Sequence, residues 1–90
     1  MKTSIIIRAY NSEKTIKRAV ESALNQEFSR RNFEIIVIND GSKDETLNIL
    51  KSFGKKIKLI NQKNQGSVLS ANKGFKIAKG KYVILLDSDE

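Results

Sequence analysis

Residues 33–53 read FEIIVINDGSKDETLNILKSF, and this stretch contains both of the periodicities that define an α/β protein. The apolar run from Phe33 to Ile38 is typical of a strand that is buried on both faces. Asn39-Asp40-Gly41 is a turn signal, and Ser42 to Glu45 has the spacing of a helix-capping box. Apolar residues at helical spacing follow the box, at Leu47, Leu50 and Phe53. The stretch therefore predicts a strand, a tight turn and a capped helix in direct succession.

The same alternation continues in both directions along the chain. Apolar runs predict further strands at residues 4–8, 57–60 and 82–86. A helical pattern follows the first of these strands, with Asn11 or Ser12 as its predicted cap. Another helical pattern precedes the last strand, and its predicted sheet-facing residues are Val68, Ala71, Phe75 and Ala78. Two glycines mark predicted helix ends, Gly54 and Gly80.

The order β-α-β-α-β-α-β implies parallel strands, because helical crossovers of this length join parallel neighbours with right-handed connections. We therefore predict an α/β fold, a Rossmann-like three-layer α/β/α arrangement around a mostly parallel sheet of about four strands. The chain has 90 residues, which fits one small domain or a piece of a larger one. No repeat or linker divides residues 1–90, so we treat them as one unit.

Composition excludes several classes of chemistry. The chain has no cysteine and no histidine, so disulfides, zinc–thiolate sites and an imidazole base are not available. No apolar stretch approaches the roughly 18 residues of a membrane-spanning helix. The start of the chain is too short in its apolar part for a signal peptide, and we expect a cytoplasmic location. The formal net charge of +7 favours phosphate-bearing partners, although scattered lysines also fit an ordinary solvated surface.

Polar residues follow three of the predicted strands, in the segments 8–11, 39–42 and 87–89. In an open parallel sheet these segments meet at the carboxyl edge, where such folds bind their ligands. Asp87 and Asp89 are two residues apart, so an extended chain presents both carboxylates on the same side. Paired carboxylates suit Mg²⁺ or Mn²⁺, whereas the simpler alternative is a solvated turn after a buried strand.

Short motifs in a fixed order and spacing connect these features. They are Ser4 to Asn11, Ala23 to Gln26, Phe33 to Ser42, Asp44, Thr46, Asn64 to Gly66, Asn72 to Gly74, and Gly80 to Asp89. On these residues the chain resembles the nucleotide-binding half of a family 2 glycosyltransferase with the GT-A fold, over nearly its whole length. The resemblance implies a truncated GT-A domain, with residues 1–90 as its N-terminal, nucleotide-sugar-binding part.

The resemblance also implies roles for individual side chains. Tyr10 matches the aromatic residue beside the nucleoside, and Asp40 matches the acidic residue that accepts a hydrogen bond from the base. Asp89 would bind the metal ion most directly, with Asp87 reaching the ribose or a metal-bound water. The nucleotide-sugar-binding residues expected on this basis are Arg8, Tyr10, Asp40, Asn72 and Asp87, and the expected metal ligands are Asp89 and Asp87.

Members of this family transfer a sugar from a nucleotide-diphosphate donor to an acceptor with inversion, and the resemblance implies a Mn²⁺ or Mg²⁺ cofactor. The expected acceptor is a carbohydrate or a lipid-linked molecule, as in polysaccharide biosynthesis. The family's catalytic base lies beyond the D-x-D pair, so we expect it beyond residue 90. We therefore expect a donor-binding fragment that is inactive alone and that self-associates through the uncovered edge of its sheet.

Three positions depart from the family pattern. Arg8 stands where many members have proline, and Asn39 stands where an aspartate is frequent. Ala71 stands where many members have an arginine near the donor. Because this chain lacks that arginine, the identity of its donor stays open. Arg8 and Lys73 are the candidates to replace that cation, although a solvated helix face is the better explanation for Lys73.

Rival interpretations remain at this stage. A haloacid-dehalogenase-like phosphatase also has D-x-D after an apolar strand, with the first aspartate as nucleophile, but there the motif normally follows the first strand. A basic nucleic-acid-binding module fits the charge, but the aromatic residues do not form a stacking platform in sequence, and we expect no nucleic-acid partner. An α/β fragment without any ligand is the third alternative.

Overall fold

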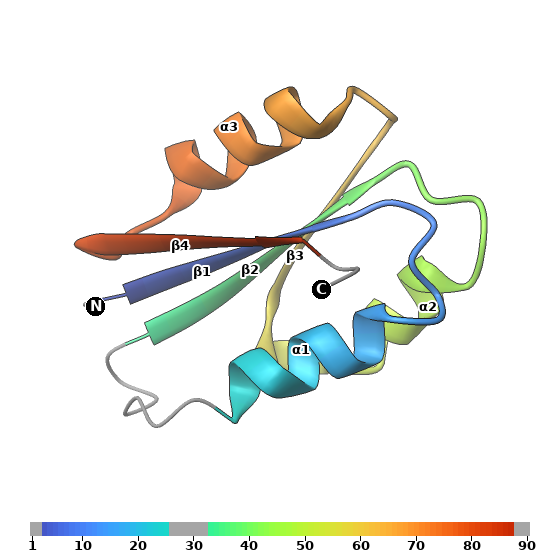
Figure 1. Cartoon of the computed structure of the whole chain (residues 1–90), viewed down its shortest axis with the longest axis horizontal. Coiled ribbons are helices and arrows are strands. Elements are labelled where there is room, and N and C mark those ends of the chain that lie inside the picture. Colours follow the sequence, from blue (N-terminus) through green and yellow to red (C-terminus); the bar gives the residue numbers. More distant parts are fainter. Residues whose placement is uncertain (1–2, 26–32, 88–90) are drawn as a thin grey trace.

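A computed structural model of the chain describes residues 3–25 and 33–87. The elements are β1 (Thr3–Ala9), α1 (Ile16–Leu24), β2 (Phe33–Asp40), α2 (Thr46–Lys51), the short 3₁₀ helix η1 (Gly54–Lys56), β3 (Lys58–Gln62), α3 (Ser67–Ile77) and β4 (Tyr82–Asp87). The strand order is β3-β2-β1-β4, and every neighbouring pair is parallel. Helix α3 covers one face of the sheet and α1 and α2 cover the other (Figure 1). The predicted three-layer α/β fold is therefore confirmed.

Two apolar cores lie on the two faces of the central strands. Alternate residues of β1 point to opposite faces, so Ile5 and Ile7 belong to the core beneath α1 and α2, whereas Ile6 belongs to the core beneath α3. Strand β2 divides in the same way, with Val37 in the first core and Ile36 in the second. Burial on both faces explains why these strands appear in the sequence as continuous apolar runs instead of alternating ones.

Helix α1 begins later than predicted. The backbone oxygen of Ser12 accepts hydrogen bonds from the backbone N–H groups of Thr15 and Ile16, at 3.0 and 2.8 Å. The Ser12 hydroxyl donates to the backbone oxygen of Tyr10 at 3.1 Å and does not cap the helix. The predicted cap at Asn11 or Ser12 is therefore wrong, because a turn stands between the strand and the helix.

The predicted capping box before α2 is also wrong. Strand β2 continues through Asp40, and the Ser42 hydroxyl donates to Asn39 Oδ1 at 2.5 Å, away from the helix. The carboxylate of Asp44 accepts hydrogen bonds from the backbone N–H and the hydroxyl of Thr46, at 2.9 and 2.6 Å. Because the Ser42 hydroxyl is bonded to Asn39, it is Asp44 that accepts the hydrogen bonds at the start of α2.

The face that α3 presents to the sheet consists mostly of small residues, with Ile77 packed on the core at the end of the helix. Ser70, Ala71 and Gly74 are buried, whereas Val68 is 71% exposed and Phe75 is 47% exposed. A Cβ atom at Gly74 would lie 2.6 Å from Ile6 Cγ2, so the helix backbone packs directly on β1. The prediction that Val68 and Phe75 face the sheet is therefore wrong, because this close approach selects small side chains over large ones.

Predicted boundaries differ by a few residues elsewhere. Strand β3 includes Asn61 and Gln62, which the sequence placed in a loop, and α3 ends at Ile77, before Gly80. Gly54 has φ +58°, which agrees with the predicted left-handed position after α2. None of the described helices has the length and hydropathy that crossing a membrane requires.

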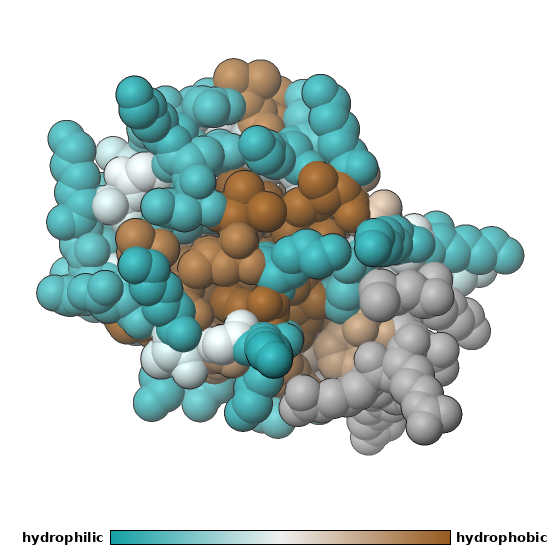
Figure 2. Space-filling view, turned by 180° about the vertical axis from the view of Figure 1, so that it is seen from behind, coloured by the Kyte–Doolittle hydropathy of each residue, from teal (hydrophilic) through white to brown (hydrophobic). Residues whose placement is uncertain are grey.

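Strand β4 forms one end of the described sheet and leaves apolar surface uncovered. Its large apolar side chains are exposed, namely Tyr82, Val83, Ile84 and Leu85. On the face seen in Figure 2, apolar atoms also reach the surface in a central area bordered by hydrophilic side chains. The predicted uncovered apolar edge is thus present in the described part of the chain, whereas self-association through it stays a prediction.

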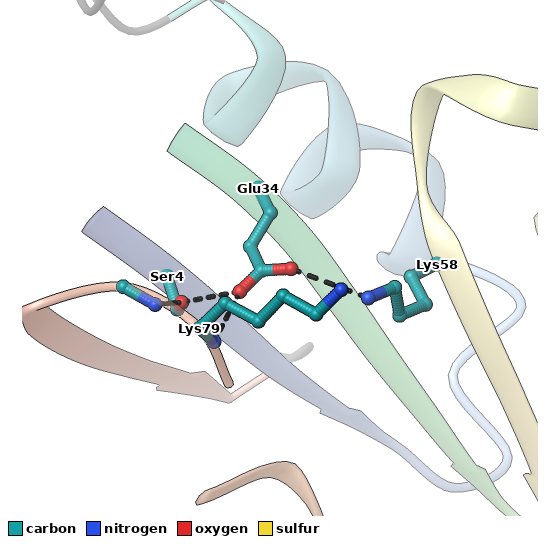
Figure 3. Close-up of polar contacts among 5 residues, drawn as sticks. Ser4, Glu34, Lys58 and Lys79 are labelled. Carbon is teal, nitrogen blue, oxygen red and sulfur yellow. Dashed lines mark hydrogen bonds and ion pairs between the residues drawn. The ribbon is translucent and has the colours of Figure 1, made fainter. Parts of the chain in front are cut away.

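At the amino ends of the strands, the carboxylate of Glu34 connects β1, β2, β3 and the segment before β4. Glu34, whose side chain is 8% exposed, accepts hydrogen bonds from the Ser4 hydroxyl at 2.6 Å and the Lys79 backbone N–H at 2.7 Å (Figure 3). Lys58 Nζ lies 3.4 Å from its other oxygen. The Ser4 hydroxyl in turn accepts from the Gly80 backbone N–H at 2.8 Å. This Glu34 clamp fixes the α3–β4 connection against β1, β2 and β3.

The Glu34 clamp predicts a defined pH dependence of stability. Burial raises the pKa of Glu34, but the hydrogen bonds from Ser4 and Lys79 and the charge of Lys58 outweigh it and lower the pKa. The stabilisation is therefore present above the unfolded-state pKa of about 4.3 and is lost as pH falls through the lower folded-state value. We expect urea unfolding to show Glu34→Gln as less stable than the parent chain at neutral pH, and the difference to shrink toward zero in acid. A difference that does not change with pH would contradict this account.

Candidate functional site

A cleft of about 830 Å³ lies at the carboxyl ends of β1, β2 and β3. Its lining residues come from the ends of β1 and β2, from the segments that follow β1, β2 and β3, and from the first turns of α3. Those that the description below uses are Arg8, Tyr10, Asn11, Asp40, Asn64 and Ser70. The cleft therefore lies at the edge where the sequence predicted a ligand site.

The segment after β1 is fixed by hydrogen bonds to the segment after β2. The backbone N–H of Asn11 donates to the Ser42 hydroxyl at 2.9 Å, and Asn11 Oδ1 accepts from the Lys43 backbone N–H at 2.8 Å. Asn11 adopts φ +48°, a left-handed conformation that asparagine tolerates better than most residues. Tyr10 is held beside this junction with half of its surface exposed. An aromatic ring is thus available at the cleft for contact with a planar ligand.

Asp40, at the end of β2, is the central acidic group of the cleft. The residue is 5% exposed. Its Oδ1 accepts hydrogen bonds from Gln62 Nε2 at 2.9 Å and from the Gln65 backbone N–H at 2.8 Å. Its Oδ2 accepts from the Gly66 backbone N–H at 3.0 Å. Asp40 therefore fixes the segment after β3 against the end of β2.

The electrostatics of Asp40 favour the ionised form. Burial raises the pKa of its carboxyl group, but the hydrogen bonds from Gln62, Gln65 and Gly66 outweigh that effect and hold the pKa below its ordinary value. At neutral pH the group is a carboxylate, which offers about four acceptor positions on its two oxygens. The bonds from Gln62, Gln65 and Gly66 fill three of these positions, which leaves about one for an N–H of a ligand.

Residues after β3 complete this wall of the cleft. Gln62 Nε2 also contacts the Ser70 hydroxyl at 3.1 Å, and that hydroxyl donates to the Gly66 backbone oxygen at 3.0 Å. Asn64 Nδ2 donates to the Asp40 backbone oxygen at 3.3 Å. The predicted site omitted these residues. The signal that could have found them is that residues 61–66 also follow a strand and so reach the same carboxyl edge.

Gly41 permits the close approach between the segments after β2 and β3. It has φ +74°, and a Cβ atom there would lie 2.6 Å from the backbone nitrogen of Asn64. Both the backbone conformation and the lack of space favour glycine. The position of Asn64 in the cleft therefore depends on a residue that has no side chain.

The structure brings Arg8, Tyr10 and Asp40 together at the cleft, as predicted. Asn72 is exposed on α3 and does not line the cleft, so its predicted role gains no support from the geometry. The backbone of Asp87 ends β4 in register with Arg8, which places it at the same edge. Asp89 lies outside the described residues. Among the side chains that the structure describes, which do not include those of Asp87 and Asp89, no three His, Cys, Asp or Glu residues form a group suited to a metal ion.

Known sequences resemble the chain over almost its whole length. The family model for Glycosyl transferase family 2 matches residues 4–90. An uncharacterized glycosyltransferase of Rickettsia prowazekii is 46% identical over 87 residues, which cover 97% of this chain and 27% of that protein. The UDP-Glc:alpha-D-GlcNAc-diphosphoundecaprenol beta-1,3-glucosyltransferase WfaP of Escherichia coli is 44% identical over 90 residues, which cover 97% of this chain and 35% of that protein. The chain thus spans 35% or less of the length of these relatives.

Solved structures show the same arrangement of elements. S. aureus TarS 1–349 in complex with UDP-GlcNAc has a TM-score of 0.88 and 36% identity, covering 99% of this chain and 27% of that one. The mannosyltransferase PcManGT from Pyrobaculum calidifontis, in complex with GDP-Man and Mn²⁺, has a TM-score of 0.85 over 98% of this chain and 27% of that one. Its identity is 20%, so this second likeness concerns the fold.

Proposed function

The chain belongs to glycosyl transferase family 2, and we propose that its cleft binds the nucleotide-diphosphate sugar from which the whole enzyme transfers a sugar with inversion. The observation that carries the proposal is the convergence of Tyr10 and the ionised, buried Asp40 on one cleft at the carboxyl edge of the sheet. An aromatic face and a carboxylate acceptor are the groups that hold a planar base with an N–H at its edge. Arg8 lines the same cleft and supplies a positive charge for the diphosphate.

A divalent cation is part of this proposal. A departing nucleoside diphosphate gains negative charge, and Mn²⁺ or Mg²⁺ neutralises it as a Lewis acid. Asp87 and Asp89 are the proposed ligands. The backbone of Asp87 pairs with Arg8, which lines the cleft, so Asp87 lies at the same edge of the sheet as the cleft. Both ions also prefer carboxylate oxygens as ligands. The fold neighbour PcManGT is solved with GDP-Man and Mn²⁺.

For the acceptor we propose a carbohydrate or a lipid-linked carbohydrate. The relative WfaP acts, by its name, on a diphosphoundecaprenol-linked sugar with UDP-Glc as donor. We also propose that the catalytic base is supplied by residues outside this chain, so that the chain alone binds donor without transferring it. The cytoplasmic location stays a prediction, and it agrees with the lack of cysteine. No observation favours the phosphatase or nucleic-acid alternatives.

Calorimetric titration with UDP, GDP and dTDP, each with and without Mn²⁺, tests the proposal. We expect one diphosphate to bind, at least roughly ten-fold more tightly with Mn²⁺, because the ion offsets repulsion between the carboxylates and the phosphates. Asp89→Ala is expected to remove the effect of Mn²⁺.

Glu21→Ala is the matched control for this titration, because it removes the same charge from an exposed position on α1. It should leave both affinity and Mn²⁺ dependence unchanged. The proposal fails if the parent chain binds none of the three diphosphates, or if Asp89→Ala retains the full Mn²⁺ effect. Turnover of a sugar nucleotide with an acceptor by the isolated chain would contradict the assignment of the base to other residues.

A further inference from the structure

A second concave surface, of about 500 Å³, lies at the amino edge of the sheet, opposite the donor cleft. Glu34 stands near the start of β2, Lys58 starts β3, and Lys79 precedes β4. We call this surface the amino-edge groove and define it by its lysines and its apolar base, namely Lys55, Lys56, Lys58, Lys79, Phe33 and Ile57. None of these residues takes part in the proposed donor site.

Positive charge is in excess in the amino-edge groove. Four lysines line it, and Glu34 is the single carboxylate among its lining residues. That carboxylate already accepts hydrogen bonds from Ser4 and from the Lys79 backbone, and it pairs with Lys58. Figure 3 shows Lys58 and Lys79 on either side of the Glu34 carboxylate, which contacts Lys58 Nζ and the backbone N–H of Lys79. The lining lysines therefore carry more positive charge than this one carboxylate neutralises, and a bound anion would offset the excess.

The base of the groove indicates which kind of anion fits. Phe33 and Ile57 are nearly buried, and they form apolar surface beneath the flexible lysine side chains. Lysine stems readily lie along apolar surface while their ammonium groups reach outward. No exposed aromatic ring lines the groove among the described residues, so it lacks the stacking surface that single-stranded nucleic acid prefers. A lysine rim over an apolar base without exposed aromatic rings suits an anionic amphiphile.

We propose that the amino-edge groove binds the anionic headgroups of phospholipids at a membrane surface. Lysines at such a surface are attracted by its negative potential, and each contributes roughly a five-fold factor in binding. The donor cleft lies at the opposite ends of the same strands, so it stays open to solution when the groove rests on a bilayer. This proposal is independent of the proposed function, because it uses other residues and another ligand.

Co-sedimentation with phosphatidylcholine vesicles, with and without phosphatidylglycerol, tests the proposal. We expect binding to vesicles that contain phosphatidylglycerol, weakened by salt, and weak or no binding to pure phosphatidylcholine. Replacing Lys55 and Lys56 together with glutamine should reduce binding about 25-fold, from two five-fold factors. Both lysines are exposed and outside the Glu34 clamp, so circular dichroism should show an unchanged fold.

The matched control replaces Lys17 and Lys73 with glutamine, which removes the same charge from exposed positions on α1 and α3. Its vesicle binding should stay within about two-fold of the parent chain, since an exposed lysine away from the surface feels little of its potential. Equal loss in both double variants, or equal binding to both kinds of vesicle, would overturn the proposal. The proposal would also be overturned if the chain bound tripolyphosphate or single-stranded RNA but not vesicles, because the groove would then bind a soluble polyanion.

Discussion

Asp40→Ala is expected to abolish measurable binding of the nucleoside diphosphate that the parent chain binds, taken as UDP in the tests below, and to lower the free energy of unfolding by about 3 kcal/mol. The substitution removes the acceptor for the side chain of Gln62 and for the backbone N–H groups of Gln65 and Gly66. Each partly buried donor left without a partner costs at least roughly 1 kcal/mol. It also removes the carboxylate that we propose as the acceptor for the base. Urea unfolding measures the first effect, and calorimetry on the folded variant measures the second.

Gln62→Ala is the control that separates these two effects. It loosens the same segment, because Gln62 bridges Asp40 and Ser70, but it leaves the carboxylate in place. We expect a loss of about 1 kcal/mol in stability and UDP affinity within a few-fold of the parent chain. If Asp40→Ala binds UDP as well as the parent chain while folded, Asp40 fixes the segment after β3 and does not contact the nucleotide.

Gly41→Ala is expected to destabilise the chain by about 2–4 kcal/mol and to weaken UDP binding as well. At φ +74° an alanine is strained by roughly 1 kcal/mol. Its Cβ atom would also lie 2.6 Å from the backbone nitrogen of Asn64, which cannot rotate away as a flexible side chain could. Relieving this overlap displaces the segment after β3 and costs roughly 1–3 kcal/mol more. Unfolding in urea and titration with UDP measure the two consequences.

Gly54→Ala is the matched control for Gly41→Ala. Gly54 also has positive φ, +58°, but a Cβ atom there would meet nothing within 4 Å. Its loss should be about 1 kcal/mol, from backbone strain alone, with unchanged UDP binding. The difference between the two alanine variants therefore measures the close approach at Asn64. Equal destabilisation by both would show that the approach at Gly41 relaxes without cost.

Local sequence patterns were sufficient for the elements but not for their contacts. The runs that became β1 and β2 are apolar at every central position, and this pattern predicts a doubly buried parallel strand without knowledge of the neighbours. The face of α3 shows the opposite case. Val68 and Phe75 have the larger apolar side chains, yet Gly74 faces the sheet because Ile6 lies directly beneath it. A helical pattern cannot show how close the sheet will be.

The position of the candidate site could be predicted from the sequence, but the hydrogen bonds within it could not. Strand ends meet at one edge in any parallel sheet, so Arg8, Tyr10 and Asp40 could be predicted to converge from the order of the elements alone. The partners of Asp40 could not, because they depend on the path of residues 62–66 over the end of β2. The two predicted helix caps failed for a related reason. The hydroxyls of Ser12 and Ser42 donate to Tyr10 and Asn39, which precede them in the chain, instead of capping the helices that follow.

The sequence by itself determined the parallel α/β architecture, the carboxyl-edge position of the cleft and the family, because periodicity, element order and short motifs are properties of neighbouring residues. The tertiary structure decided which polar groups pair: Asp40 with the segment after β3, and Glu34 with Ser4, Lys58 and the chain before β4. These partners are between 24 and 45 residues apart along the chain. Hydrogen bonds need contact within about 3 Å, and only the tertiary fold, through strand register and the paths of the loops, brings such distant groups that close.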